Sequence, residues 1–98
     1  KLTTTMVALG IFSMGSILAY ALDLEGGELV YHGGQTKEII YSEIQDKITD
    51  NDKYWSVYAS VKVGGNTYNS GWQNDYAYKE ADRVWYANES SYYDYKAR

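Results

Sequence analysis

The chain has 98 residues, 13 acidic and 9 basic side chains, a formal net charge of −4 and no cysteine. This length accommodates one domain, and disulfides are excluded as the source of its stability. The acidic balance argues against a nucleic-acid partner, because phosphate binding depends on Lys and Arg.

The first 21 residues have the pattern of a secretory signal peptide. A lysine at position 1 precedes an apolar run from Met6 to Leu18, and Ala19-Tyr20-Ala21 fits the small-residue cleavage pattern. Such a run is marginal for crossing a bilayer core of about 30 Å. We predict an N-terminal apolar helix over residues 1–21, cleaved near Ala21 on secretion, and a mature domain over residues 22–98. A permanent anchor helix and a buried core helix are the alternatives.

The next segment mixes one clear strand signal with one ambiguous pattern. Leu29 to His32 reads as a short strand stopped by Gly33-Gly34. Between residues 35 and 53, four isoleucines lie near helical spacing, but a strand over residues 38–42 followed by a polar loop fits equally well.

Residues 55–72 carry the strongest pattern in the chain. Five apolar residues, Trp55, Val57, Ala59, Val61 and Val63, alternate with Ser56, Tyr58, Ser60 and Lys62. This period of two predicts a half-buried strand. Gly64-Gly65 then predicts a hairpin turn with Gly65 at positive φ, because glycine adopts that conformation without a steric cost. On the return strand, Gly71 marks a bulge.

Two further strands are predicted after the hairpin. The first runs from Ala77 to Ala87, residues 88–91 form a turn, and Tyr92, Tyr93 and Tyr95 lie on a terminal strand. Short strands with turn signals between them predict an all-β fold, a small antiparallel β-sandwich. Aromatic residues make up 16% of the chain, and their rings either fill the core or form a recognition surface.

The residues that carry catalysis are sparse. His32 is the single histidine, and no serine has a nucleophile-elbow context. The run Asp46, Asp50, Asn51 and Asp52 lacks the mid-loop glycine and closing glutamate of an EF-hand. We therefore predict no enzymatic activity, no metal site and no cofactor; a small hydrolase using His32 is the least favoured hypothesis.

Several segments in order resemble the lactococcin 972 family of bacteriocins. These are the N-terminal apolar segment, "GGELVYHGG", "YSEIQDKITDNDKYWSVYASVKVGG" and "SGWQNDYAYKEADRVWYANESSYYDYK". The resemblance covers nearly all of residues 26–95. It implies a secreted, cysteine-free β-sandwich that binds the cell-wall precursor lipid II and blocks septum formation in related Gram-positive bacteria. It also implies an immunity membrane protein and an ATP-binding cassette transporter as partners in the producing cell.

The resemblance directs attention to a set of candidate target-binding residues. Tyr31 stands near the position where the family usually has a tryptophan, and the cations Lys62, Lys79 and Arg83 are candidate donors to a pyrophosphate. The aromatic candidates on the later strands are Trp72, Tyr92, Tyr93 and Tyr95. The prototype of the family is cationic, whereas residues 22–98 have a net charge of −5, since Lys1 alone among the basic residues precedes them. The alternative function is a secreted, non-toxic binding or signalling module that uses the tyrosine-rich surface.

Overall fold

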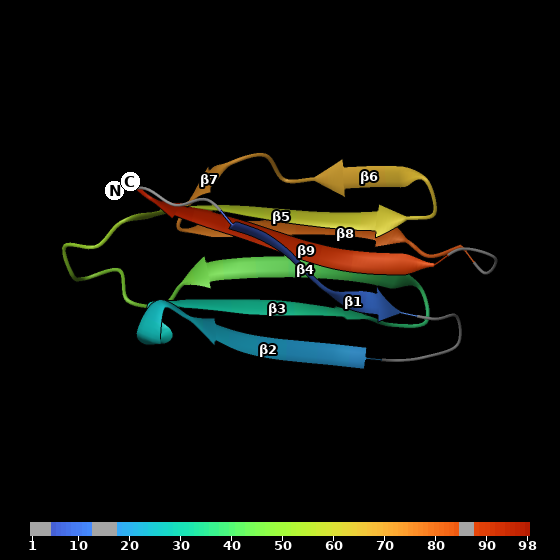
Figure 1. The fold of residues 1–98 in the computed structure, drawn as a ribbon, viewed down its shortest axis with the longest axis horizontal. Helices are drawn as coiled ribbons and strands as arrows, with labels where there is room; N and C mark the ends of the chain where they lie inside the picture. Colours follow the sequence, from blue (N-terminus) through green and yellow to red (C-terminus); the bar gives the residue numbers. More distant parts are fainter. Residues whose placement is uncertain (1–4, 13–17, 85–87) are drawn as a thin grey trace.

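The computed structural model describes residues 5–12, 18–84 and 88–98, and consists of two antiparallel β-sheets packed face to face (Figure 1). Sheet A has the strand order β1-β9-β5-β6, with β7 also paired to β5, and sheet B has the order β2-β3-β4-β8. The elements are β1 (Thr5–Phe12), β2 (Leu18–Leu24), the 3-10 helix η1 (Glu25–Gly27), β3 (Leu29–Gln35), β4 (Ile39–Asp46), β5 (Trp55–Val63), β6 (Asn66–Asn69), β7 (Gln73–Asn74), β8 (Tyr76–Asp82) and β9 (Glu89–Ala97). The predicted all-β antiparallel architecture is confirmed.

The N-terminal segment differs from the predicted helix. Residues 5–12 form β1, which pairs with β9, and residues 18–24 form β2, which pairs with β3. The β-branched residues in "TMVALGIF" favour extended backbone, and pairing with β9 satisfies their backbone groups along one side. The rest of the predicted signal peptide, residues 1–4 and 13–17, lies outside the described residues. The predicted cleavage point after Ala21 falls within β2, and cleavage stays a prediction.

The ambiguous segment after residue 35 is a strand. In β4, Ile40, Ser42 and Ile44 are buried while the residues between them are partly exposed, which is the alternation of a strand with one face on the core. Hydrogen-bonded neighbours lie on both sides, β3 and β8. The spacing of four residues between Ile40 and Ile44 fits either a helix or a strand. The segment is a strand because it pairs with β3 on one side and β8 on the other.

The predicted hairpin forms, but its turn uses a different glycine. β5 pairs with β6 in a register that ends at Val63↔Asn66, so Gly64 and Gly65 are the two loop residues. Gly64 has φ 59°, whereas Gly65 is absent from the positive-φ glycines of the described chain. A positive φ at the first loop position alone is the pattern of a type II′ turn. The prediction that Gly65 holds the strained position is therefore wrong by one residue.

Replacing Gly64 by valine is expected to destabilise the fold by about 1–2 kcal/mol, because a β-branched residue is strained at positive φ. Gly65→Val is the matched control, since an added Cβ there has no heavy atom within 4 Å. Urea denaturation of both variants measures the difference. Equal stabilities would contradict the turn geometry.

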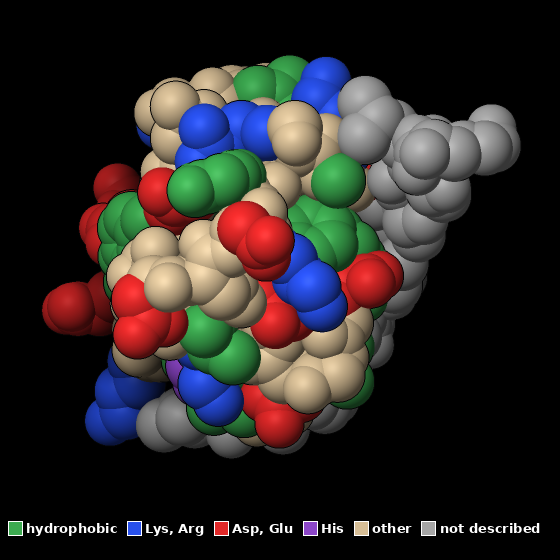
Figure 2. Space-filling view, turned by 90° about the vertical axis from the view of Figure 1, so that its left-hand side faces the viewer, with side chains coloured by type: hydrophobic (Ala, Val, Ile, Leu, Met, Phe, Trp, Pro, Cys, Tyr) green, Lys and Arg blue, Asp and Glu red, His purple; other side chains and the backbone are tan. Residues whose placement is uncertain are grey.

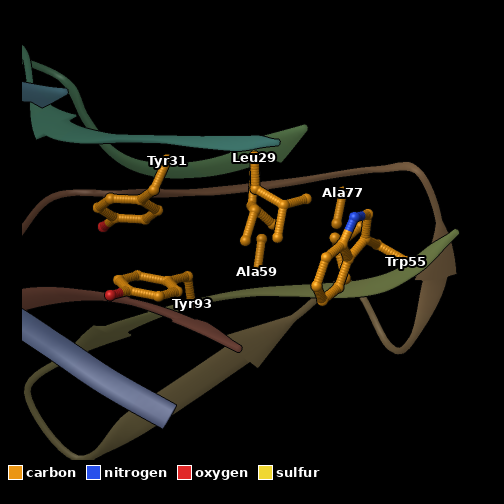
Figure 3. Packing of buried hydrophobic residues seen from close by; sticks show 8 residues of the cluster. Leu29, Tyr31, Trp55, Ala59, Ala77 and Tyr93 are labelled. Carbon is orange, nitrogen blue, oxygen red and sulfur yellow. The ribbon is translucent and has the colours of Figure 1, made fainter. Parts of the chain in front are cut away.

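The core between the sheets is built largely from aromatic and β-branched side chains (Figure 3). Its main cluster joins both sheets and contains Leu29, Tyr31, Ile44, Trp55, Val57, Ala59, Ala77 and Tyr93. The rings of Tyr31 and Tyr93 lie over one another with centroids 4.6 Å apart, and the Trp55 ring meets Tyr95 edge-on at 5.7 Å. Each ring contributes a large buried area, which stabilises a small domain that has no disulfides.

A polar ladder crosses the interior beside these rings. The Tyr31 hydroxyl and Ser91 Oγ are hydrogen-bonded, and Ser91 Oγ donates to the Tyr41 carbonyl at 2.9 Å. Because the single hydroxyl proton of Ser91 is used in the bond to the Tyr41 carbonyl, the Tyr31 hydroxyl is the donor in its bond to Ser91. Ser42 Oγ donates to the Tyr92 carbonyl at 2.6 Å, which makes a second link between the sheets. Burial raises the pKa of the Tyr31 hydroxyl to about 12.

Candidate functional site on the outer face of sheet A

The structure separates the predicted target-binding residues into core and surface positions. Tyr31 is fully buried and Tyr93 is 4% exposed. Their rings pack against each other at an interplanar angle of 40° inside the sandwich, so in this arrangement they present almost no side-chain surface to a partner. The aromatic pattern that marked them as candidates is explained by the core.

Arg83 is also occupied inside the protein. Its side chain is 3% exposed and lies beside Glu89, which is fully buried, with Nε 3.3 Å from Glu89 Oε1. Its Nη1 donates to the Thr36 carbonyl. A guanidinium held in this way neutralises Glu89 and is unavailable to an external pyrophosphate.

Lys79 and Tyr95 lie away from the remaining candidates. Lys79 is a partly exposed residue of β8, in sheet B. Tyr95 is half-buried at the η1 end of the sandwich, where its hydroxyl donates to Glu25 Oε2 at 2.9 Å. The pKa of the Tyr95 hydroxyl is raised to about 12, mainly by burial and next by its hydrogen bond to the Glu25 carboxylate.

The other three candidates, Lys62, Trp72 and Tyr92, lie around the outer face of sheet A. On β5, Tyr58 and Lys62 point away from the core because they alternate with the buried Val57, Ala59 and Val61. On β9, Tyr92 and Lys96 lie on the same face, since the register pairs them with Ser60 and Ser56. Four side chains of one face, from two adjacent strands, therefore combine apolar rings with ammonium groups.

Trp72 is held over this face by a break between β6 and β7. Gly71 has φ 68°, and its N–H donates to Asn69 Oδ1 at 2.9 Å. Across the break, Ser70 Oγ accepts the Ala59 N–H at 3.0 Å, so β5 keeps a hydrogen bond where the ladder is interrupted. The bulge predicted at Gly71 is present as this interruption, and it lets the chain fold Trp72 toward β5.

The resulting contacts define what we call the aromatic strip: Tyr58, Trp72 and Lys96. The Tyr58 and Trp72 rings are 5.3 Å apart at an interplanar angle of 47°. Lys96 Nζ lies 4.5 Å from the centre of the Trp72 ring, within the range of a cation–π contact. Trp72 remains 40% exposed. Sequence reasoning missed Tyr58 and Lys96, although each is four residues from a candidate on its own strand, the spacing that places both on one strand face.

A small pocket lies at the hairpin end of β5, beyond the aromatic strip. It has a volume of about 150 Å³ and includes Lys62, Ser90 and Tyr92 in its lining. Glu89 also contributes to the pocket, with its charge offset by Arg83. The Lys62 ammonium group and the hydroxyl groups of Ser90 and Tyr92 suit the anionic or hydroxyl oxygens of a ligand.

Other kinds of site receive little support from the described residues. Within residues 5–12, 18–84 and 88–98, no group of three or more His, Asp or Glu side chains is arranged to hold a metal ion. His32 lies on sheet B, with Nδ1 3.4 Å from Glu43 Oε1. In the same part of the chain, no helix has the length and apolar character needed to span a bilayer.

No family model, curated protein or solved structure matches this chain.

Proposed function

We propose that this protein is a secreted antibacterial protein that binds a cell-envelope component without covalent chemistry. The observation that carries the proposal is the aromatic strip, in which a tryptophan stays exposed between a second ring and an ammonium group. Exposed Trp and Tyr side chains give rigid contact area at a low entropic cost, and they dominate binding energies at many interfaces.

The proposed target is lipid II, the component implied by the resemblance to the lactococcin 972 family. Its sugars offer apolar faces to Tyr58 and Trp72, and its pyrophosphate offers anionic oxygens to Lys96 beside the Trp72 ring. Lys62 lies on the same face, six register positions along the β5–β9 pair, and adds positive charge there. These local cations answer the objection that the whole chain is acidic, because recognition depends on charges near the ligand. An immunity membrane protein and a transporter in the producing cell belong to the same proposal.

The test combines growth, microscopy and direct binding. Purified protein is added to dividing Gram-positive cells with and without excess lipid II, and inhibition of septation that lipid II relieves is expected. Inhibition that lipid II leaves unchanged would retain the antibacterial function and reject this target. Normal growth at all doses would favour the second candidate function, a non-toxic binding module that uses the same strip.

Replacing Trp72 by alanine is expected to weaken binding to vesicles containing lipid II at least about tenfold, because a central exposed ring contributes about 2 kcal/mol or more at a binding surface. Lys96→Glu is expected to act in the same direction. Tyr68→Ala is the matched control, since Tyr68 is 42% exposed on β6 but lies outside the strip. Equal affinities for the Trp72 and Tyr68 variants would reject the strip as the binding surface.

A further inference from the structure

The outer face of sheet B lies on the opposite side of the sandwich from the aromatic strip and carries rings and carboxylates. On β8, Tyr76, Tyr78 and Glu80 are exposed and alternate with residues that face the core. The register places Glu43 of β4 beside Tyr78. In the same way, Tyr41 of β4 lies beside Glu80. Tyrosine rings and carboxylates therefore alternate over two adjacent strands.

Hydrogen bonds hold these groups in place without neutralising them. The Tyr76 hydroxyl donates to Glu43 Oε2 at 2.7 Å, and the Tyr78 hydroxyl donates to Glu80 Oε1 at 2.6 Å. The two rings remain 47% and 38% exposed. His32 Nδ1 lies 3.4 Å from Glu43 Oε1, but among the residues that the structure describes no Lys or Arg is within ion-pair distance of either glutamate. This face therefore presents fixed rings together with negative charge.

The exposed charges of the two outer faces have opposite signs. In the described strands of sheet A, Lys62 and Lys96 are the charged side chains that reach solvent, because the carboxylates of Glu89 and Asp94 are buried. On sheet B, Asp82 adds a third carboxylate to the two glutamates, and the outward positions of β4 and β8 carry no Lys or Arg. Figure 2 views the sandwich from one end and shows acidic side chains projecting along its left-hand side.

Charge determines which faces of two copies can meet. Contact between two sheet A faces would bring lysines together, and contact between two sheet B faces would bring carboxylates together, so both pairings are opposed by repulsion. Contact between unlike faces places Lys96 over carboxylates. It also lays the ring of Trp72 against the exposed tyrosines of β8, an aromatic contact that adds to the buried area.

The size of the two faces is sufficient for such a contact. The molecule measures 45 × 21 × 16 Å along its principal axes, and Figure 1 looks down the shortest axis onto the broad faces of the sheets. A face 45 Å long and 21 Å wide accommodates the area of about 800 Å² that each partner buries in a stable interface.

We propose that the outer face of sheet B docks onto the outer face of sheet A of a second copy of this chain. Because the two contacting surfaces differ, each added copy leaves one face of each kind open, and copies stack in series. Each contact covers one aromatic strip. This inference goes beyond the proposed function, since it concerns contacts between copies and does not depend on what the strip binds.

The test is sedimentation velocity of the full chain in the absence of lipid II. Between about 10 μM and about 1 mM, where weak association is detected, the weight-average sedimentation coefficient is expected to rise beyond the value for a dimer. Raising sodium chloride from about 0.05 M to about 0.5 M is expected to weaken association about tenfold, because salt screens surface charges. A chain that stays monomeric, or that stops at a dimer, would overturn the proposal.

Charge reversal on each face separates the two surfaces. Lys96→Glu alters the face of sheet A and Glu80→Lys alters the face of sheet B, and each variant alone is expected to associate at least about tenfold more weakly. Mixed in equal amounts, the two variants are expected to recover association, because each supplies the intact face that the other lacks. A mixture that associates no better than the separate variants would contradict docking between unlike faces.

Two loop variants control for net charge. Lys37→Glu and Asp50→Lys make the same changes of charge at exposed positions between strands, and both are expected to associate as the unmodified protein does. Circular dichroism of all four variants verifies that each is folded. If the loop variants weaken association as much as the face variants do, net charge governs association and the proposal is wrong.

Discussion

Arg83→Met is expected to destabilise the protein by about 3–5 kcal/mol, because removing one partner of a buried ion pair leaves the other charge uncompensated. Arg83 and Glu89 are 3% and 0% exposed, with Nε 3.3 Å from Oε1, and Glu89 Oε2 has no hydrogen-bond partner in the described structure. A loss of this size is a large part of the 5–15 kcal/mol that is typical of domains. Chemical denaturation measures it.

Two further variants separate the buried pair from ordinary surface charge. Lys47→Met removes an exposed pair with Asp23, whose atoms are 3.9 Å apart, and its cost is expected to stay below about 1 kcal/mol. The double variant Arg83→Met with Glu89→Leu removes both buried charges and is expected to recover most of the lost stability. If Arg83→Met costs as little stability as Lys47→Met, then Glu89 does not become an uncompensated buried charge when Arg83 is removed, and the argument is wrong.

Gly33→Ala is expected to destabilise the protein by about 2–4 kcal/mol. An added Cβ at this position would collide with the Tyr31 hydroxyl and would lie 2.8 Å from Ser91 Oγ. These two groups form one hydrogen bond of the polar ladder, so the substitution adds overpacking to the loss of a buried hydrogen bond. Thermal or urea denaturation measures the loss, and near-ultraviolet circular dichroism reports the disturbed tyrosine packing.

The size of the Gly33 effect has its own controls. Gly65→Ala adds the same methyl group where no heavy atom lies within 4 Å, and it is expected to change stability by less than about 1 kcal/mol. In the Gly33→Ala background, Tyr31→Phe removes the atom that collides first, so the two substitutions together are expected to cost less than their sum. Additive costs would mean that Gly33 and Tyr31 do not meet.

A strand can be predicted from the sequence when its own pattern of apolar residues shows which side is buried. It cannot be predicted when its burial depends on contacts with other segments. β5 is predictable because each of its inward positions is apolar, a local signal. The start of β9 is not predictable, since Glu89, Ser90 and Ser91 resemble a turn but are buried in a strand. Their partners lie outside this stretch: Ser91 bonds to Tyr31, 60 residues earlier in the sequence, and Glu89 pairs through Oε1 with Arg83, six residues earlier.

The candidate site shows the same division. Alternation along β5 and β9 indicates that Tyr58 and Lys96 point outward, so part of the strip was accessible from the sequence. The position of Trp72 depends on the break at Gly71 and on the Ser70 hydrogen bond to β5, neither of which a repeating pattern encodes. The sequence alone does not decide whether Tyr31 and Tyr93 are buried or exposed, because a tyrosine suits both a core with polar partners and a binding surface.

The place of β9 in sheet A has a consequence for the order of folding. β9 is the last of the described strands in chain order, yet it lies between β1 and β5 in the sheet. Its residue Tyr95 pairs with Thr5, 90 positions earlier in the sequence. Contacts between residues so far apart form slowly. While the chain is being synthesised, β5 lacks its principal neighbour, and Trp55 and Tyr31 lack the rings of Tyr95 and Tyr93. Assembly of sheet A therefore awaits the synthesis of β9, and until then β5 has only the short strands β6 and β7 as hydrogen-bonded neighbours.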